Sequence, residues 1–296
     1  MSHRTLPLAL LLGACVGDYA AHGDIEATYL QTGPYDVTYV GEFACCDRDD
    51  SEFVAWLPGG DAARPVLVWG NGTAAGTDNY LTLLEHFASW GFAVVAPENP
   101  GVGDGVPLVE ALDAAAAANA EADSPLFGRL DLGRVGAAGH SQGAGGATNL
   151  MRADNERVTA LVTFSRPHAQ WCTEDALCPH PTELERGATF YVTGGRDVIL
   201  APPSAQRAVY NHTPDEIRKV RATLRGARHT DPEGDPGCED VPFCARGAEG
   251  FLGYPTAWLA ANLGVDGGAL AAFGPEGELS EATEDWSDVR TNVEVP

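Results

Sequence analysis

The chain has 296 residues and a formal net charge of −24, because 42 Asp and Glu residues outnumber 18 Lys and Arg residues. Its apolar fraction of 44% is that of an ordinary globular protein, and the length suits one large α/β domain or two small ones. A surface this acidic repels phosphates, so we exclude nucleic acid as a partner.

The N-terminus reads as an export signal. A short basic start leads into an apolar run from Leu6 to Ala14, which is far shorter than the roughly 20 residues of a membrane-spanning helix. We therefore expect residues 1–14 to be a signal peptide. Its end, Leu12-Gly13-Ala14-Cys15, is similar to a bacterial lipobox, which predicts lipidation of Cys15; the alternative is ordinary signal cleavage that removes Cys15. Any membrane association is expected only through that lipid.

Strand and helix patterns alternate along the rest of the chain. Short apolar runs predict strands, and apolar residues at helical spacing predict the helices between them. The predicted strands are Tyr35–Val40, Glu52–Leu57, Pro65–Trp69, Phe92–Ala96, Arg134–Ala138, Val158–Phe164, Ala188–Thr193 and Lys219–Leu224; the predicted helices are Asn79–Trp90, residues 108–122, Gly143–Met151, Ala205–Asn211 and Thr256–Leu263.

This alternation predicts an α/β fold with a mostly parallel central sheet and helices on both faces. We expect residues 15–29 to be a linker and residues 30–274 to form one catalytic domain. After Phe273 the chain is acidic and has no apolar period, so residues 275–296 are predicted to be a surface-laid or loose tail.

Six cysteines remain after Cys15, an even number that favours disulfides in an exported chain. Cys172 and Cys178 are predicted to pair, and Cys238 and Cys244 have the same spacing. A ring between the neighbours Cys45 and Cys46 would be strained, so each is expected to reach elsewhere. Zinc is the alternative, but the chain has no CxxC spacing and no histidine pair at ligand distance, so we expect no metal.

The segment Gly139-His140-Ser141-Gln142-Gly143 has the pattern G-x-S-x-G. A predicted strand precedes it and a helix rich in small residues follows, which is the setting that exposes a nucleophilic serine on a strained turn. The sequence therefore predicts Ser141 as a nucleophile; the alternative is a glycine-rich turn with an incidental serine.

A serine nucleophile of this type is followed in the chain by an acid and then a histidine. Asp197 follows the strand Ala188–Thr193, and His229 follows the strand Lys219–Leu224, so we predict them as acid and base. Asp175 is the rival acid, in a loop between two cysteines. The remaining downstream histidines fit less well: His168 and His180 precede Asp197, and His212 ends an amphipathic helix.

An oxyanion hole requires two backbone donors. One is expected at Gln142, directly after the serine, and the other in the loop Gly70-Asn71-Gly72-Thr73 after an earlier strand. We predict Thr73 as the second donor, with Asn71 or Gly72 as alternatives. Trp171 and His140 are expected to contact the substrate.

Several segments together resemble the α/β-hydrolase group of bacterial cutinases, polyester hydrolases and chlorophyllase-like esterases. They are GPYDV (33–37), FVAWLP (53–58), VLVWGNGT (66–73), FASWGFAVVAPE (87–98), RVGAAGHSQGAGG (134–146), TGGRDVILAPPSAQRAVYN (193–211) and the closing TAWLAANL. The resemblance covers about residues 30–274 and implies a carboxylic-ester hydrolase.

The chain departs from polyester hydrolases at two positions. Those enzymes usually carry an aromatic residue where Thr73 stands and a methionine where Gln142 stands, so the resemblance favours an esterase over a polyester-degrading enzyme. We expect a monomeric, exported serine esterase that acts without a cofactor on short- to medium-chain apolar esters or on polyesters. Alternatives are another acyl hydrolase, such as a peptidase or thioesterase, and a non-catalytic binding protein with the same fold.

Overall fold

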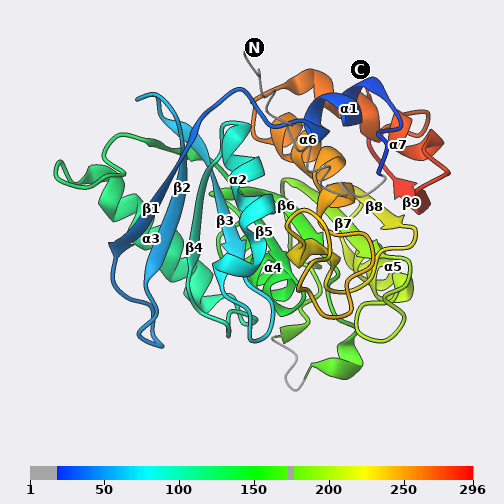
Figure 1. Ribbon diagram of the computed structural model, residues 1–296, viewed down its shortest axis with the longest axis horizontal. Helices are drawn as coiled ribbons and strands as arrows, with labels where there is room; N and C mark the ends of the chain where they lie inside the picture. Colours follow the sequence, from blue (N-terminus) through cyan, green and yellow to red (C-terminus); the bar gives the residue numbers. More distant parts are fainter. Residues whose placement is uncertain (1–18, 173–176, 296) are drawn as a thin grey trace, which may run out of the picture.

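A computed structural model describes residues 19–172 and 177–295 and shows one mixed nine-stranded sheet within them (Figure 1). The order across the sheet is β1-β2-β4-β3-β5-β6-β7-β8-β9. The strands are β1 (Val37–Ala44), β2 (Phe53–Pro58), β3 (Arg64–Gly70), β4 (Ala93–Pro97), β5 (Leu130–His140), β6 (Val158–Phe164), β7 (Ala188–Gly194), β8 (Arg218–Leu224) and β9 (Trp286–Thr291).

The six central strands, from β4 through β3 to β8, are parallel, and the pairs at both margins of the sheet are antiparallel. Parallel strands carry their carboxyl ends to the same edge of a sheet, where the loops that follow them meet. The loops after β3, β5, β7 and β8 therefore lie together, although they are far apart in the sequence.

Helices cover both faces of the sheet because its buried strands are apolar on both sides. In β3, for example, Leu67 and Trp69 belong to one core and Val66 and Val68 to the other. The first core includes side chains of α1, α2 and α6, and the second includes side chains of α3, α4 and α5. These helices are α1 (Asp24–Leu30), α2 (Leu81–Ser89), α3 (Val106–Ala120), α4 (Gln142–Ala153), α5 (Pro203–His212) and α6 (Gly253–Asn262), with a short α7 (Glu278–Glu281) near the C-terminus. The predicted fold class is confirmed.

The prediction that residues 275–296 form a surface-laid or loose tail is wrong. Residues 286–291 form β9, which pairs antiparallel with β8 and completes the sheet. Trp286, Leu279 and Val293 are almost fully buried. These apolar residues are widely spaced among acidic ones and show no helix or strand period, which is why the sequence pattern did not reveal them.

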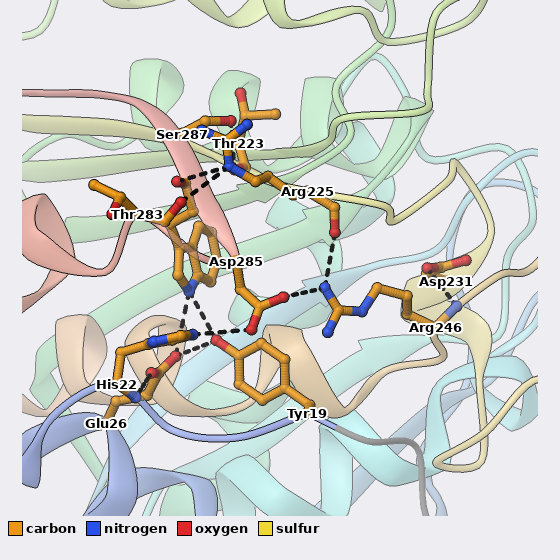
Figure 2. A network of polar contacts seen from close by, with 11 residues as sticks. Tyr19, His22, Glu26, Thr223, Arg225, Asp231, Arg246, Thr283, Asp285 and Ser287 are labelled. Carbon is orange, nitrogen blue, oxygen red and sulfur yellow. Dashed lines mark hydrogen bonds and ion pairs between the residues drawn. The ribbon is translucent and has the colours of Figure 1, made fainter.

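The prediction of a linker over residues 15–29 is also wrong where the structure describes it, because α1 packs against α6. A polar network joins this N-terminal segment to the C-terminal strand (Figure 2). The Trp286 indole N–H donates to the Tyr19 hydroxyl oxygen at 2.7 Å, and Tyr19 hydrogen-bonds to the carboxylate of Glu26. Burial raises the pKa of Glu26. The two ends of the described chain thus share one buried cluster.

All six cysteines in the described residues form disulfides. The predicted Cys172–Cys178 pair is confirmed, and Cys238–Cys244 forms the second bridge. The expectation that Cys45 and Cys46 each reach elsewhere is wrong, because they are bonded to each other.

Asp231 lies close to Cys238 and Cys244, but cysteines joined in a disulfide offer no thiolate to a metal. Among the described residues, no helix has both the length and the apolar character needed to cross a membrane. The predicted signal peptide and Cys15 lie outside the described residues.

Candidate active site

Ser141 lies on a sharp turn between β5 and α4, with φ of 54° and ψ of −124°. Non-glycine residues rarely adopt a positive φ, so the surrounding structure must hold this conformation. Close packing explains the glycines on either side: a Cβ atom at Gly143 would collide with the Gly70 carbonyl, and one at Gly139 would collide with Gly143. The backbone N–H of Ser141 donates to the Phe164 carbonyl at 2.9 Å. The turn therefore projects the serine from the carboxyl edge of the sheet.

The structure brings Ser141, His229 and Asp197 together. His229 Nε2 lies 2.9 Å from Ser141 Oγ, and His229 Nδ1 lies 2.5 Å from Asp197 Oδ2. The other oxygen of Asp197 accepts the backbone N–H of Ala201 at 3.0 Å, which fixes the buried carboxylate. A carboxylate on Nδ1 leaves Nε2 of a neutral ring free to accept the serine proton.

The rival histidines have other contacts. His212 bonds to the Ala208 carbonyl of its own helix and stacks on His180, with 4.1 Å between ring centroids. His168 accepts the backbone N–H of Gln170. Asp175, the rival acid, lies outside the described residues.

The loop after β3 approaches the serine. Gly72, Thr73 and Gln142 all line the cleft beside Ser141. The Gly72 N–H donates to the Tyr80 hydroxyl at 3.0 Å, so this N–H is not free to bind an oxyanion. The Asn71 side chain is buried and donates to the Pro97 and Asn99 carbonyls. The bond to Tyr80 disfavours Gly72, and Asn71 is fully buried and is not among the residues that line the cleft, so Thr73 with Gln142 stays the predicted donor pair.

Sequence reasoning missed a buried relay behind the site. His140 Nε2 lies 2.8 Å from the His229 carbonyl oxygen, and Nδ1 lies 2.9 Å from the Tyr80 hydroxyl. A carbonyl only accepts, so Nε2 must carry the proton and Nδ1 accepts from Tyr80. Burial, with the neighbouring His229, holds the pKa of His140 well below its usual value, which keeps the ring neutral.

The relay connects three parts of the site through hydrogen bonds. Gly72 in the loop after β3 donates to Tyr80, Tyr80 donates to His140, and His140 donates to the backbone of His229. His140, predicted to contact substrate, does line the cleft, but both its nitrogens are engaged by the protein. No local pattern marks Tyr80, because its partner lies 60 residues away in the chain.

A cleft of about 530 Å³ opens beside Ser141. Its apolar lining consists of Pro167, Trp171, Leu177 and Leu200. Trp171 is half exposed, and its indole N–H donates to the Ile199 carbonyl at 2.6 Å, which orients the ring. Trp171 thus lines the cleft, and its contact with a substrate stays a prediction.

Thr230 and Glu233 add a polar part to the cleft, from the loop that carries His229. Glu233 Oε1 lies 3.6 Å from His140 Nδ1. Burial raises the pKa of Glu233, and attraction to His229 partly opposes this rise. Neither Glu233 nor Leu200 was selected from the sequence, because no motif surrounds them.

Comparison with known protein families gives a match to the PETase family, described as PET hydrolase-like, over residues 73–236. The match covers more than half of the chain and includes the Ser141 turn and the loops of Asp197 and His229. The chain belongs to the PET hydrolase-like family. No curated protein matches it.

Membership of the PET hydrolase-like family confirms the resemblance to cutinases and polyester hydrolases. It makes the chain an α/β-hydrolase of ester substrates. The three disulfides and the family together fit an extracellular enzyme.

Proposed function

We propose that this PET hydrolase-like chain is an exported serine esterase that works through an acyl-enzyme. The observation that carries the proposal is the continuous hydrogen-bond chain from Ser141 through His229 to Asp197. A serine hydroxyl is a weak nucleophile until a base removes its proton, and His229 Nε2 is within hydrogen-bond distance to do so.

In this mechanism Ser141 Oγ attacks the ester carbonyl while its proton passes to His229 Nε2. Asp197 stabilises the resulting imidazolium, and the backbone N–H groups of Gln142 and Thr73 stabilise the oxyanion. His229 then returns the proton to the departing alkoxide, which leaves as an alcohol. Water, activated by the same histidine, hydrolyses the acyl-serine and regenerates the enzyme.

The cleft supports a neutral, mostly apolar substrate of short to medium chain length. Its apolar lining suits one acyl or aromatic group. The disulfide Cys172–Cys178 restrains the chain next to Trp171, which supports a short and fixed cleft wall. Each buried methylene contributes about 0.8 kcal/mol, so kcat/KM should rise roughly fourfold per methylene until the cleft ends.

Export, lipidation of Cys15 and a monomeric state belong to the same proposal. The disulfides support export, since such bonds persist in oxidising compartments. The high negative charge supports the absence of a nucleic-acid partner.

The test is a series of p-nitrophenyl esters from two to sixteen carbons. We expect hydrolysis with a maximum at short to medium length. His229→Ala should lower kcat by roughly 10³-fold or more, whereas His212→Ala, which removes a surface histidine, should leave it unchanged.

The same series separates the alternatives. Activity that still increases at sixteen carbons would contradict the open cleft and indicate a lipase-like tunnel. No turnover of any ester would contradict the esterase and favour a binding protein.

A further inference from the structure

Glu233 is a carboxylate in the cleft that the proposed triad does not use. It ends a short 3₁₀ turn (Asp231–Glu233), and its backbone N–H donates to the Thr230 carbonyl at 3.0 Å, which fixes the turn four residues after His229. Only 18% of its side chain is exposed. The carboxylate therefore lies inside the cleft and not on the open surface.

Within the described residues, Glu233 has no Lys or Arg at ion-pair distance. Its contact at ion-pair distance among these residues is with His140 Nδ1 at 3.6 Å, but that nitrogen already accepts from Tyr80 in a neutral ring. Burying a carboxylate without a cation is unfavourable, which agrees with the raised pKa of Glu233. The group is thus an unpaired acid available to a ligand.

The rest of the cleft matches this chemistry. Among the described residues, its lining contains no Lys or Arg, and the ionisable side chains in it are those of His140, His229 and Glu233. The half-exposed ring of Trp171 lines the same cleft. An aromatic face and a carboxylate are the two groups that favour a quaternary ammonium ion, through cation–π attraction and ion pairing.

The loop that carries His229 also brings Thr230 and Glu233 to the lining of the cleft, so a ligand group beside His229 lies near this carboxylate. His229 must deliver its proton to the alcohol oxygen, so this part of the ester lies beside Nε2. Glu233 follows His229 in the same loop and is attracted to its ring.

Resting on the proposed esterase activity, we propose that Glu233 selects esters whose alcohol part carries an ammonium group. A cationic alcohol would neutralise the buried carboxylate, whereas an anionic one would be repelled by it and by the −24 charge of the chain.

The test compares butyrylcholine with 3,3-dimethylbutyl butyrate, a neutral ester of nearly the same shape. At pH 8 and low ionic strength, kcat/KM of the wild type should favour the choline ester about tenfold. Glu233→Gln should bring the ratio close to one, because the neutral amide keeps the shape of the side chain and loses the attraction to the cation.

Asp235→Asn is the matched control, because Asp235 is an exposed carboxylate two residues away that does not line the cleft. It should keep the wild-type ratio, which separates a contact in the cleft from the general field of the protein. p-Nitrophenyl butyrate turnover by each variant shows that the triad is intact.

An unchanged ratio in Glu233→Gln, or a wild type that prefers the neutral ester, would overturn the inference. Hydrolysis of p-nitrophenyl butyrate without turnover of butyrylcholine would overturn the inference about Glu233 and leave the proposed esterase function standing. If the wild type hydrolysed none of the three esters, the proposed esterase function itself would be overturned.

Discussion

Replacing Tyr80 with phenylalanine tests whether the buried relay positions the active site. The ring stays and one oxygen is lost, so the packing against Trp69 and His140 is kept. Two buried groups then lose their partners: the Gly72 N–H and His140 Nδ1. Each unsatisfied buried group costs about 1–3 kcal/mol, so the free energy of unfolding should fall by roughly 2–6 kcal/mol.

The effect on catalysis should appear in kcat. The loop of Gly72 loses the bond that fixes it, and the His140 ring, which holds the backbone of His229, loses the bond that fixes its Nδ1 side. Small displacements of reacting groups lower rates strongly, so kcat for p-nitrophenyl butyrate should fall roughly 10- to 100-fold with a smaller change in KM.

Tyr191→Phe is the matched control. Tyr191 is also fully buried, and its hydroxyl bonds to Thr213 at 2.7 Å, in the core on the other face of the sheet. Thr213 keeps its second bond to the Val209 carbonyl, so this variant should lose only about 1 kcal/mol of stability and no activity.

Urea unfolding and steady-state kinetics on both variants decide the matter. If Tyr80→Phe keeps the wild-type kcat, or if Tyr191→Phe loses as much, the relay does not position the site.

Two further predictions concern stability. Burial lowers the pKa of His86 from 6.5 to about 4. Between pH 6.5 and pH 4, His86 is therefore protonated in the unfolded state and neutral in the folded state. This contribution to stability is fully present above pH 6.5 and is lost as the pH is lowered toward 4. Between pH 7 and pH 4, urea unfolding should show that the wild type loses about 3 kcal/mol more stability than His86→Gln. Equal losses in the two proteins would refute this prediction. Trp286→Ala should lower the free energy of unfolding by about 3–5 kcal/mol, because the ring is buried. Trp171→Ala is the control and should lower it far less, because that ring is half exposed. If Trp286→Ala left the free energy of unfolding unchanged, β9 would contribute nothing to the core.

Features that are local in the sequence predicted most of the fold. The strand Val158–Phe164 was predicted with its observed bounds, because a buried parallel strand is a continuous apolar run. The expected order of serine, acid and histidine pointed to the three residues that the structure brings together, because parallel strands carry their ends to one edge. Their catalytic roles stay a prediction.

Features that depend on contacts in three dimensions were not predicted. Trp286 is an isolated apolar residue in an acidic segment, and only its packing against the sheet reveals β9. Tyr80 reads as the start of an amphipathic helix, yet its hydroxyl bridges Gly72 and His140. Glu233 has no motif around it, and its role follows from the cleft that encloses it.

The central claim is that Ser141 is the acylated nucleophile. A serine-directed phosphonate, incubated with the wild-type protein and followed by intact mass and peptide mapping, tests it most directly. We expect one adduct, located on Ser141 and absent from Ser141→Ala. An adduct on any other residue, or one that persists in Ser141→Ala, would contradict it.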